Sequence, residues 1–164
     1  MQRRFFIGLI VVLLGLAAGI VWWLWFAPVS TSGTPTSGDG QAKLTIHEHE
    51  FLVDLAIRSE TQATGLAYRD DLASDRGMLF LFTEPQRLSF WMKGMRFPLD
   101  IIWIRDQRVI AISPEVPLAP RRGILPTYAP KSPADAVLEV RAGLAKNLGI
   151  SVGDTVSWEI LTSE

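Results

Sequence analysis

The chain has 164 residues, with 16 Lys and Arg against 17 Asp and Glu, and a formal net charge of −1 at pH 7. This length fits one domain plus an appendage, and the charge balance gives none of the basic excess that typifies nucleic-acid-binding domains. Because the chain has no cysteine, disulfides, thiolate metal sites and a cysteine nucleophile are excluded.

The N-terminal segment carries a long apolar run. Residues 1–4 include two arginines and precede an uncharged apolar run at residues 5–27. As a helix rising about 1.5 Å per residue, this run spans roughly 35 Å, which is enough to cross a bilayer core. It is longer than the apolar region of a secretory signal peptide, so we expect a retained transmembrane anchor, with cleavage near Ala18 as the alternative. The two arginines predict that residues 1–4 are cytoplasmic and that the rest of the chain lies on the periplasmic side of the inner membrane.

A linker and a β-rich domain follow the apolar run. Residues 28–42 are rich in Ser, Thr, Gly and Pro without apolar periodicity, which predicts a flexible linker before a soluble domain at residues 43–164. Alternating apolar and polar residues predict strands at 43–47 and 51–57. Ser59 with Gln62 predicts a capping box that starts a short helix ending before Tyr68.

Residues 77–104 form the apolar centre of this domain, rich in Phe, Met and Trp, and read as three strand runs separated by two breaks. Beyond them, the pattern predicts strands at 108–114, 136–140 and 155–161, a long proline-rich loop at 114–133, and a short helix at 144–148 closed by Gly149. The predicted fold class is α+β, mainly β. We expect a small half-open barrel or rolled sheet with two short helices, preceded by one N-terminal transmembrane helix.

Three ordered motifs and the tail of the chain resemble a known family. The motifs are Gly77–Phe80, Phe90–Lys93 and Pro98–Ile101, and the tail runs from Leu138 to Asp154. This pattern is similar to the family called domain of unknown function 192, over roughly Leu44 to Trp158. The resemblance implies a small β-rich domain, commonly exported or anchored, and no established activity. No catalytic residue is therefore carried over to this chain.

The chain departs from the family's usual residues in two places. Gly94 and Met95 stand where Asn-Thr is usual, and after Gly65-Leu66 the residue before Tyr68 is Ala67, where Met is usual. If those polar positions help to hold a ligand in relatives, the resemblance does not carry that ligand over to this chain.

A candidate binding face surrounds Trp91. Strand alternation places Leu88, Phe90 and Met92 on one face and Ser89, Trp91 and Lys93 on the other. An aromatic ring beside a hydroxyl and an ammonium is typical of surfaces that bind sugars, peptides or anions. The alternative is that Trp91 covers the edge of the core with its N–H group hydrogen-bonded.

Asp100 begins the third strand run and shares a face with Ile102 and Ile104. Burying its carboxylate requires partners, and Lys93, Arg96, Arg69 or backbone N–H groups are the candidates. The structural interpretation is an ion pair or a cap, and the functional one is a ligand hydroxyl acceptor or a general base.

A metal site is a weaker alternative. His47 and His49 share a strand face, and His with Met is a ligand set that selects Cu(I), which would add Met92 and Met95. No third ligand has diagnostic spacing, so we predict no resident metal or cofactor.

We therefore expect a membrane-anchored extracytoplasmic domain that binds an envelope saccharide, a peptide or a partner protein without chemistry of its own. Its platform would be Trp91, Lys93 and Asp100, with Arg69 and the 114–133 loop as a rim. No nucleic acid is expected as a partner. The alternatives are an envelope hydrolase or lyase that uses Asp100, and a Cu(I)-binding protein, so the residues leave enzymatic activity open.

Overall fold

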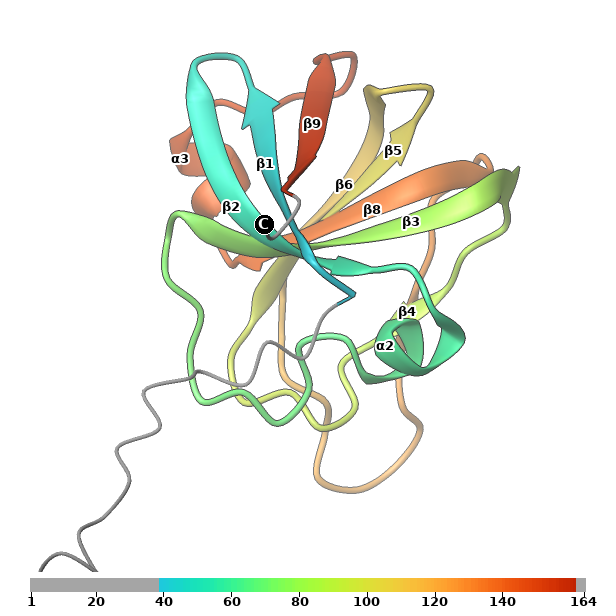
Figure 1. Cartoon of the computed structure of the whole chain (residues 1–164). Coiled ribbons are helices and arrows are strands. Elements are labelled where there is room, and N and C mark those ends of the chain that lie inside the picture. Colours follow the sequence, from blue (N-terminus) through green and yellow to red (C-terminus); the bar gives the residue numbers. More distant parts are fainter. Residues whose placement is uncertain (1–38, 162–164) are drawn as a thin grey trace, which may run out of the picture. The chain divides into compact units, whose positions relative to one another are not determined.

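A computed structural model describes residues 39–161 of the chain (Figure 1). The predicted transmembrane helix at 5–27, and the linker up to residue 38, lie outside the described residues. Among the residues that are described, the search for a membrane-spanning helix finds none of sufficient length and apolarity.

The described residues form nine strands and two short helices. In chain order they are β1 Gln41–Ile46, β2 His49–Ala56, α2 Ser59–Thr64, β3 Arg76–Gln86, β4 Phe90–Trp91, β5 Leu99–Arg105, β6 Arg108–Val116, β7 Thr127–Tyr128, β8 Ala134–Arg141, α3 Leu144–Asn147 and β9 Val156–Leu161. The predicted mainly-β class with two short helices is confirmed. The differences are at element ends, where β1 begins two residues early, and in the proline-rich loop, which contains β7.

Seven strands form one sheet in the order β6-β5-β8-β3-β2-β1-β9, and β4 pairs with β7 separately. Neighbours are antiparallel except β2 and β3, which are parallel and joined by the crossover that carries α2, because parallel strands need a long connection. The edge strands β6 and β9 approach at one end, where the Val109 N–H donates to the Asp154 carbonyl at 2.9 Å. The sheet is therefore curved but not closed (Figure 1).

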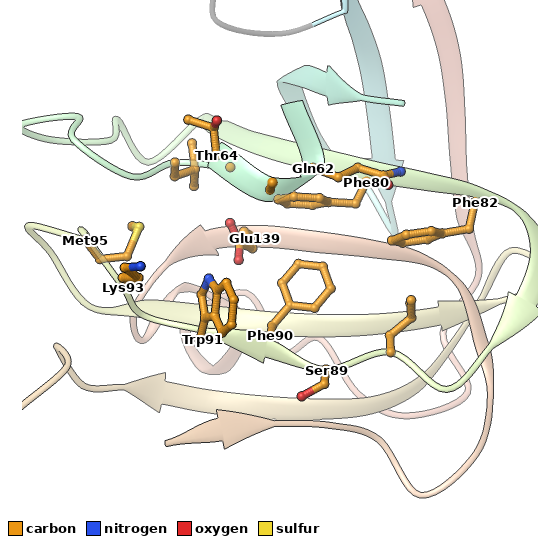
Figure 2. Close-up of a pocket in the computed structure, with 14 residues that line it drawn as sticks. Gln62, Thr64, Phe80, Phe82, Ser89, Phe90, Trp91, Lys93, Met95 and Glu139 are labelled. Atoms are coloured by element: carbon orange, nitrogen blue, oxygen red, sulfur yellow. The ribbon is translucent and has the colours of Figure 1, made fainter. Parts of the chain in front are cut away.

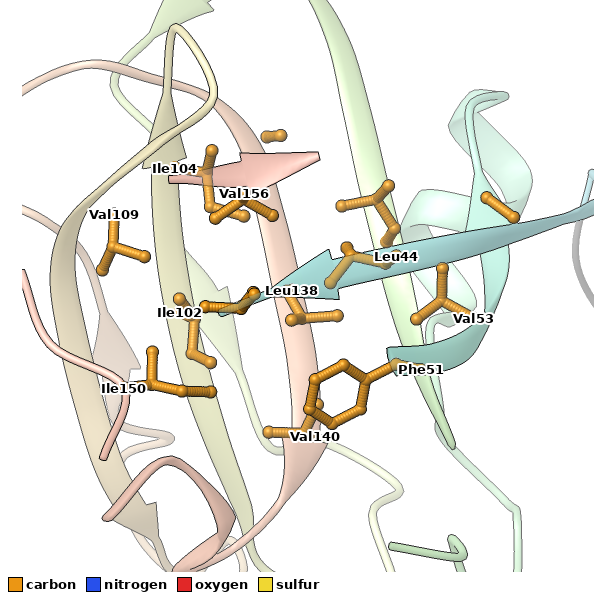
Figure 3. Close-up of a cluster of buried hydrophobic side chains, with 14 of the residues drawn as sticks. Leu44, Phe51, Val53, Ile102, Ile104, Val109, Leu138, Val140, Ile150 and Val156 are labelled. Carbon is orange, nitrogen blue, oxygen red and sulfur yellow. The ribbon is translucent and has the colours of Figure 1, made fainter. Parts of the chain in front are cut away.

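The two faces of the sheet carry separate apolar clusters, because side chains alternate along each strand. One cluster, the Phe51 core, includes Leu44, Phe51, Val53, Ile102, Ile104, Leu138, Val140 and Val156 (Figure 3). The other, the Phe80 core, includes Met78, Phe80, Met92, Leu99, Ile101, Trp103 and Val137. The crossover with α2 and the connection between β3 and β5 pack over the Phe80 core, and this covered face holds the candidate site.

The start of α2 is held differently from the predicted capping box. The residue at the N-cap, Arg58, makes no side-chain cap. Instead the Asp39 carboxylate accepts hydrogen bonds from the N–H groups of Ile57 at 2.6 Å and Arg58 at 2.7 Å, and from the Thr61 hydroxyl. Burial opposes ionisation of Asp39, but these donors outweigh it and lower its pKa. Gln62 donates its amide to the Leu81 carbonyl at 2.9 Å, which ties α2 to β3.

Candidate functional site

A cavity of about 250 Å³ opens on the Phe80-core face of the sheet. Its floor comes from β3 and β8, one wall from residues 62–66 at the end of α2, and the other from residues 88–95 around β4 (Figure 2). The lining residues are Gln62, Ala63, Thr64, Gly65, Leu66, Phe80, Phe82, Leu88, Ser89, Phe90, Trp91, Lys93, Met95 and Glu139. We call this cavity the Glu139 pocket.

Aromatic rings form most of the apolar surface of the pocket. Phe80 and Phe90 meet edge to face with their ring centroids 4.9 Å apart, and Phe90 in turn meets Trp103 below it at 5.4 Å. Trp103 is fully buried, and its indole N–H donates to the Ser113 hydroxyl at 3.1 Å. Edge-to-face packing favours fixed ring orientations, so the orientations of Phe80 and Phe90 are supported by Trp103.

Glu139 lies in β8, opposite Met78 of β3 and Ile101 of β5. Its side chain points into the pocket (Figure 2), yet the residue is only 5% exposed. Burial raises the pKa of its carboxyl from 4.5 to about 8. Within residues 39–161, the structure shows no hydrogen bond or ion pair to this carboxyl, and burial alone accounts for its raised pKa. Since no fully enclosed side-chain oxygen in this part of the chain lacks a partner, the carboxyl oxygens are in contact with the open space of the pocket. A buried acid without a protein partner is therefore available to a ligand.

Gly65 keeps the space in front of Glu139 open. It ends α2 with φ 53° and ψ −136°, a conformation that side chains disfavour. A Cβ atom added there would lie 3.2 Å from Cζ of Phe80 and 3.9 Å from Oε2 of Glu139. Glycine thus satisfies both the backbone turn and the close approach of that turn to the pocket floor.

Two of the four predicted site residues line this pocket. Trp91 and Lys93 both contribute to it, and Trp91 is 53% exposed, so its ring forms part of the entrance. The backbone of Trp91 pairs with Thr127 of β7. The 114–133 loop therefore supports the strand that carries Trp91, but none of its residues is among the pocket lining, contrary to its predicted place at the rim.

Asp100 does not join Trp91 and Lys93, which corrects the expected convergence. It is fully buried, and its carboxylate accepts the backbone N–H groups of Glu115 at 2.7 Å, Gly143 at 3.0 Å and Ala145 at 2.8 Å. Strand alternation sends it to the face of Ile102, whereas the pocket lies on the face of Ile101. Asp100 therefore joins β5 to β6 and to the start of α3, as the structural interpretation predicts.

Arg69 also lies outside the pocket lining. Its guanidinium pairs with the Asp54 carboxylate at 2.7 Å. Asp54 is on β2, opposite Met78, and faces the same side of the sheet as Glu139. Arg69 thus neutralises a buried acid one strand beyond Met78, and the predicted role at the rim does not match its position.

The residues of the alternative metal set lie in separate parts of the fold. His47 and His49 are at the β1–β2 turn, where His47 Nε2 lies 3.1 Å from Oδ2 of Asp154. Met92 is 2% exposed inside the Phe80 core, and Met95 lines the Glu139 pocket. In the part of the chain that the structure describes, His, Asp and Glu form no group of three or more that could hold a metal ion.

Glu139 is the site residue that the sequence interpretation missed. The signal was present, because the predicted strand at 136–140 contains a single acid among apolar residues. A strand with apolar side chains on both faces is covered on both sides. An acid within it must therefore be buried, and buried acids often mark functional sites.

Two solved structures are similar to this chain. One is a protein of unknown function from Novosphingobium aromaticivorans DSM 12444, with 35% identity and a TM-score of 0.63 over 72% of this chain and 84% of that one. The other, described as a "putative transcription regulator" from Sinorhizobium meliloti 1021, has 31% identity and a TM-score of 0.64 over 72% of this chain and 92% of that one. No match was found among curated proteins. Residues 42–158 match the family model described as DUF192, uncharacterized ACR, and the chain belongs to that family.

Proposed function

We propose that this chain is a membrane-anchored extracytoplasmic binding domain and that its ligand occupies the Glu139 pocket. The observation that carries the proposal is a cavity of about 250 Å³ that combines aromatic walls with one buried carboxyl to which no described residue forms a hydrogen bond or an ion pair. Ligand sites in proteins typically have mostly apolar walls and a few convergent polar groups. The ligand is a small envelope molecule or the exposed group of a larger one, such as a saccharide unit, a peptide side chain or a partner protein.

The anchor and the location rest on the N-terminal sequence. Residues 5–27 are apolar and uncharged, and Arg3 and Arg4 precede them, which favours a cytoplasmic N-terminus and a domain outside the cytoplasm. A C-terminal reporter that is active only outside the cytoplasm tests this topology. If only a C-terminal reporter that is active in the cytoplasm gives a signal, this topology is contradicted.

Binding without chemistry is favoured over the two alternatives. A hydrolase or lyase that uses Asp100 would need an accessible carboxylate, and Asp100 is fully buried with both oxygens accepting backbone N–H groups. A Cu(I) site would need His47 and His49 beside Met92. The two histidines lie at the β1–β2 turn, whereas Met92 is buried in the Phe80 core. One similar structure is described as a "putative transcription regulator", but the net charge of −1 here does not favour a nucleic-acid partner for this chain.

The proposal is tested by following the indole N–H resonances of the full chain during titration. Envelope saccharides, short peptides and small amines should shift the Trp91 signal, assigned through Trp91→Phe, because Trp91 forms the pocket entrance. Trp158 provides an internal control, since it packs against the Phe51 core on the other face of the sheet. If no compound moves the Trp91 signal, or if both signals move together, the pocket is not the binding site.

A further inference from the structure

The chemistry of the pocket narrows the ligand class. We propose that the Glu139 pocket binds a small organic cation, whose ammonium group pairs with the Glu139 carboxylate while its carbon substituents contact the aromatic walls. This inference rests on the proposed function, because it names the ligand of the same pocket.

Glu139 has no counter-charge in the empty pocket. It is buried among mostly apolar side chains, and no described residue forms a hydrogen bond or an ion pair with its carboxyl. An ionised carboxylate in such a place is strongly disfavoured unless a positive group accompanies it. A cationic ligand would supply the counter-charge of the Glu139 carboxylate, and the ion pair would form in a pocket from which water is largely excluded.

The walls of the pocket are aromatic. Phe80, Phe90 and Trp91 surround the region in front of Glu139 (Figure 2). The faces of aromatic rings carry negative electrostatic potential and attract cations, Trp most strongly. A neutral sugar would also pack on these rings, but it would leave the acid without a charge partner.

Few other charged side chains lie near Glu139 in the described part of the chain. Among the residues that line the pocket, the one other charged side chain is Lys93, which is exposed and forms no ion pair within the described chain. From β2, Asp54 faces the same side of the sheet but is paired with Arg69 at 2.7 Å, and from β5, Asp100 faces the opposite side. A positive group in the pocket is therefore attracted by Glu139 and repelled by Lys93.

The volume of the pocket limits the size of the ligand. A cavity of about 250 Å³ is smaller than the roughly 300–1,000 Å³ of clefts that hold drug-sized ligands. It accommodates a single ammonium head with a short substituent, and not an oligosaccharide. Larger ligands would present such a group from a chain that leaves the pocket beside Trp91.

A cation must bind the ionised form of Glu139, so binding releases a proton. Because burial raises the pKa of Glu139 to about 8, the affinity should rise with pH until this value is passed and then level off. For a permanently charged ligand, the apparent Kd should be about 25-fold weaker near pH 6.5 than near pH 8.5, following the ionised fraction of one carboxyl. A neutral ligand that accepts a hydrogen bond from the protonated acid would show the opposite trend.

The experiment compares choline with its uncharged carbon analogue, 3,3-dimethylbutan-1-ol, by titration calorimetry on the full chain. Both have the same shape, and neither titrates in the range used. Choline should bind with the pH dependence given above, the analogue should not bind, and Glu139→Gln should abolish choline binding. Glu159→Gln is the matched control, because it removes an exposed carboxylate of β9 outside the pocket, and it should bind choline as the unmodified chain does.

Circular dichroism of each variant shows whether it is folded, so loss of binding in Glu139→Gln is interpreted only with a native spectrum. Should the variant not fold, the pH series on the unmodified chain still decides the question. Equal binding of both compounds, or choline binding that does not change with pH, would overturn cation recognition. If a saccharide or peptide shifts the Trp91 resonance while choline does not, this inference fails and the proposed function survives. If nothing shifts it, both fail.

Discussion

Replacing Glu139 by Gln should make the protein more stable near pH 8 and should change its stability little near pH 4.5. Burial raises the pKa of this carboxyl from 4.5 to about 8 in the folded chain, while the unfolded chain keeps the ordinary value. Between these values the folded state holds a proton that the unfolded state has lost. The stabilising contribution is therefore complete below about pH 4.5 and is lost progressively as the pH rises through about 8.

The magnitude follows from that interval. At about 1.4 kcal/mol per pH unit, the free energy of unfolding should fall by about 4 to 5 kcal/mol between pH 4.5 and pH 8 because of Glu139 alone. Small domains have total stabilities of about 5–15 kcal/mol, so the effect is a large share of the whole. Gln has nearly the same shape and no charge, and the difference between the two proteins removes the contributions of all other titrating groups.

The assay is urea unfolding of the full chain and of Glu139→Gln at a series of pH values, followed by far-UV circular dichroism. The two free energies should converge near pH 4.5 and diverge toward pH 8, with the variant the more stable. Glu159→Gln, an exposed change on β9, should reproduce the pH dependence of the unmodified chain. Parallel curves for the unmodified chain and Glu139→Gln would mean that the acid is not held neutral in the fold, and the reasoning would be refuted.

Three further changes test the parts of the fold that position the pocket. Asp100→Ala should lower the free energy of unfolding by about 3 to 5 kcal/mol in urea titrations, since it removes the acceptor of three backbone N–H groups, one of them buried; a loss below about 1 kcal/mol would show that water replaces the carboxylate. Asp39→Ala should cost about 1 to 2 kcal/mol and speed hydrogen exchange in α2, because Asp39 accepts the Ile57 and Arg58 N–H groups; unchanged exchange would contradict this role. Gly77→Ala should lower the melting temperature, because an added Cβ would lie 2.7 Å from the Glu139 carbonyl oxygen; a melting temperature equal to that of the unmodified chain would mean that β3 and β8 separate easily.

Local patterns predicted the elements well, because each depends on residues close in the sequence. Alternation at 51–57 gave β2 and placed Phe51, Val53 and Leu55 on one face, where the Phe51 core contains all three. The capping box at Ser59 was wrong for a physical reason. Asp39 lies far from α2 in the sequence and accepts the N–H groups of Ile57 and Arg58 just before the helix and the Thr61 hydroxyl within it, so no local pattern at the helix contains this information.

Predicting the site requires knowing which face of the sheet the crossover covers, and local sequence patterns do not give this information. Alternation correctly grouped Trp91 with Lys93 and Asp100 with Ile102, but nothing local states that the two groups lie on opposite faces of the sheet. The parallel pairing of β2 with β3 decides it, because the crossover with α2 lies over the Phe80 core. Once that face is known, Glu139 follows from its register opposite Met78.

Glu139 is a position where the fold would be more stable with another residue. The strand around it is apolar on both faces, and the carboxyl has to stay protonated to be tolerated there at neutral pH. Stability lost at a cavity, rather than at random along the sheet, is the usual pattern of a binding site. A cationic ligand would reverse the loss, because it stabilises the ionised form that the empty pocket opposes. Saturating choline should therefore reduce the decrease of the free energy of unfolding with pH in the unmodified chain. It should leave the pH dependence of Glu139→Gln unchanged, and the difference between the two proteins tests whether Glu139 binds the cation.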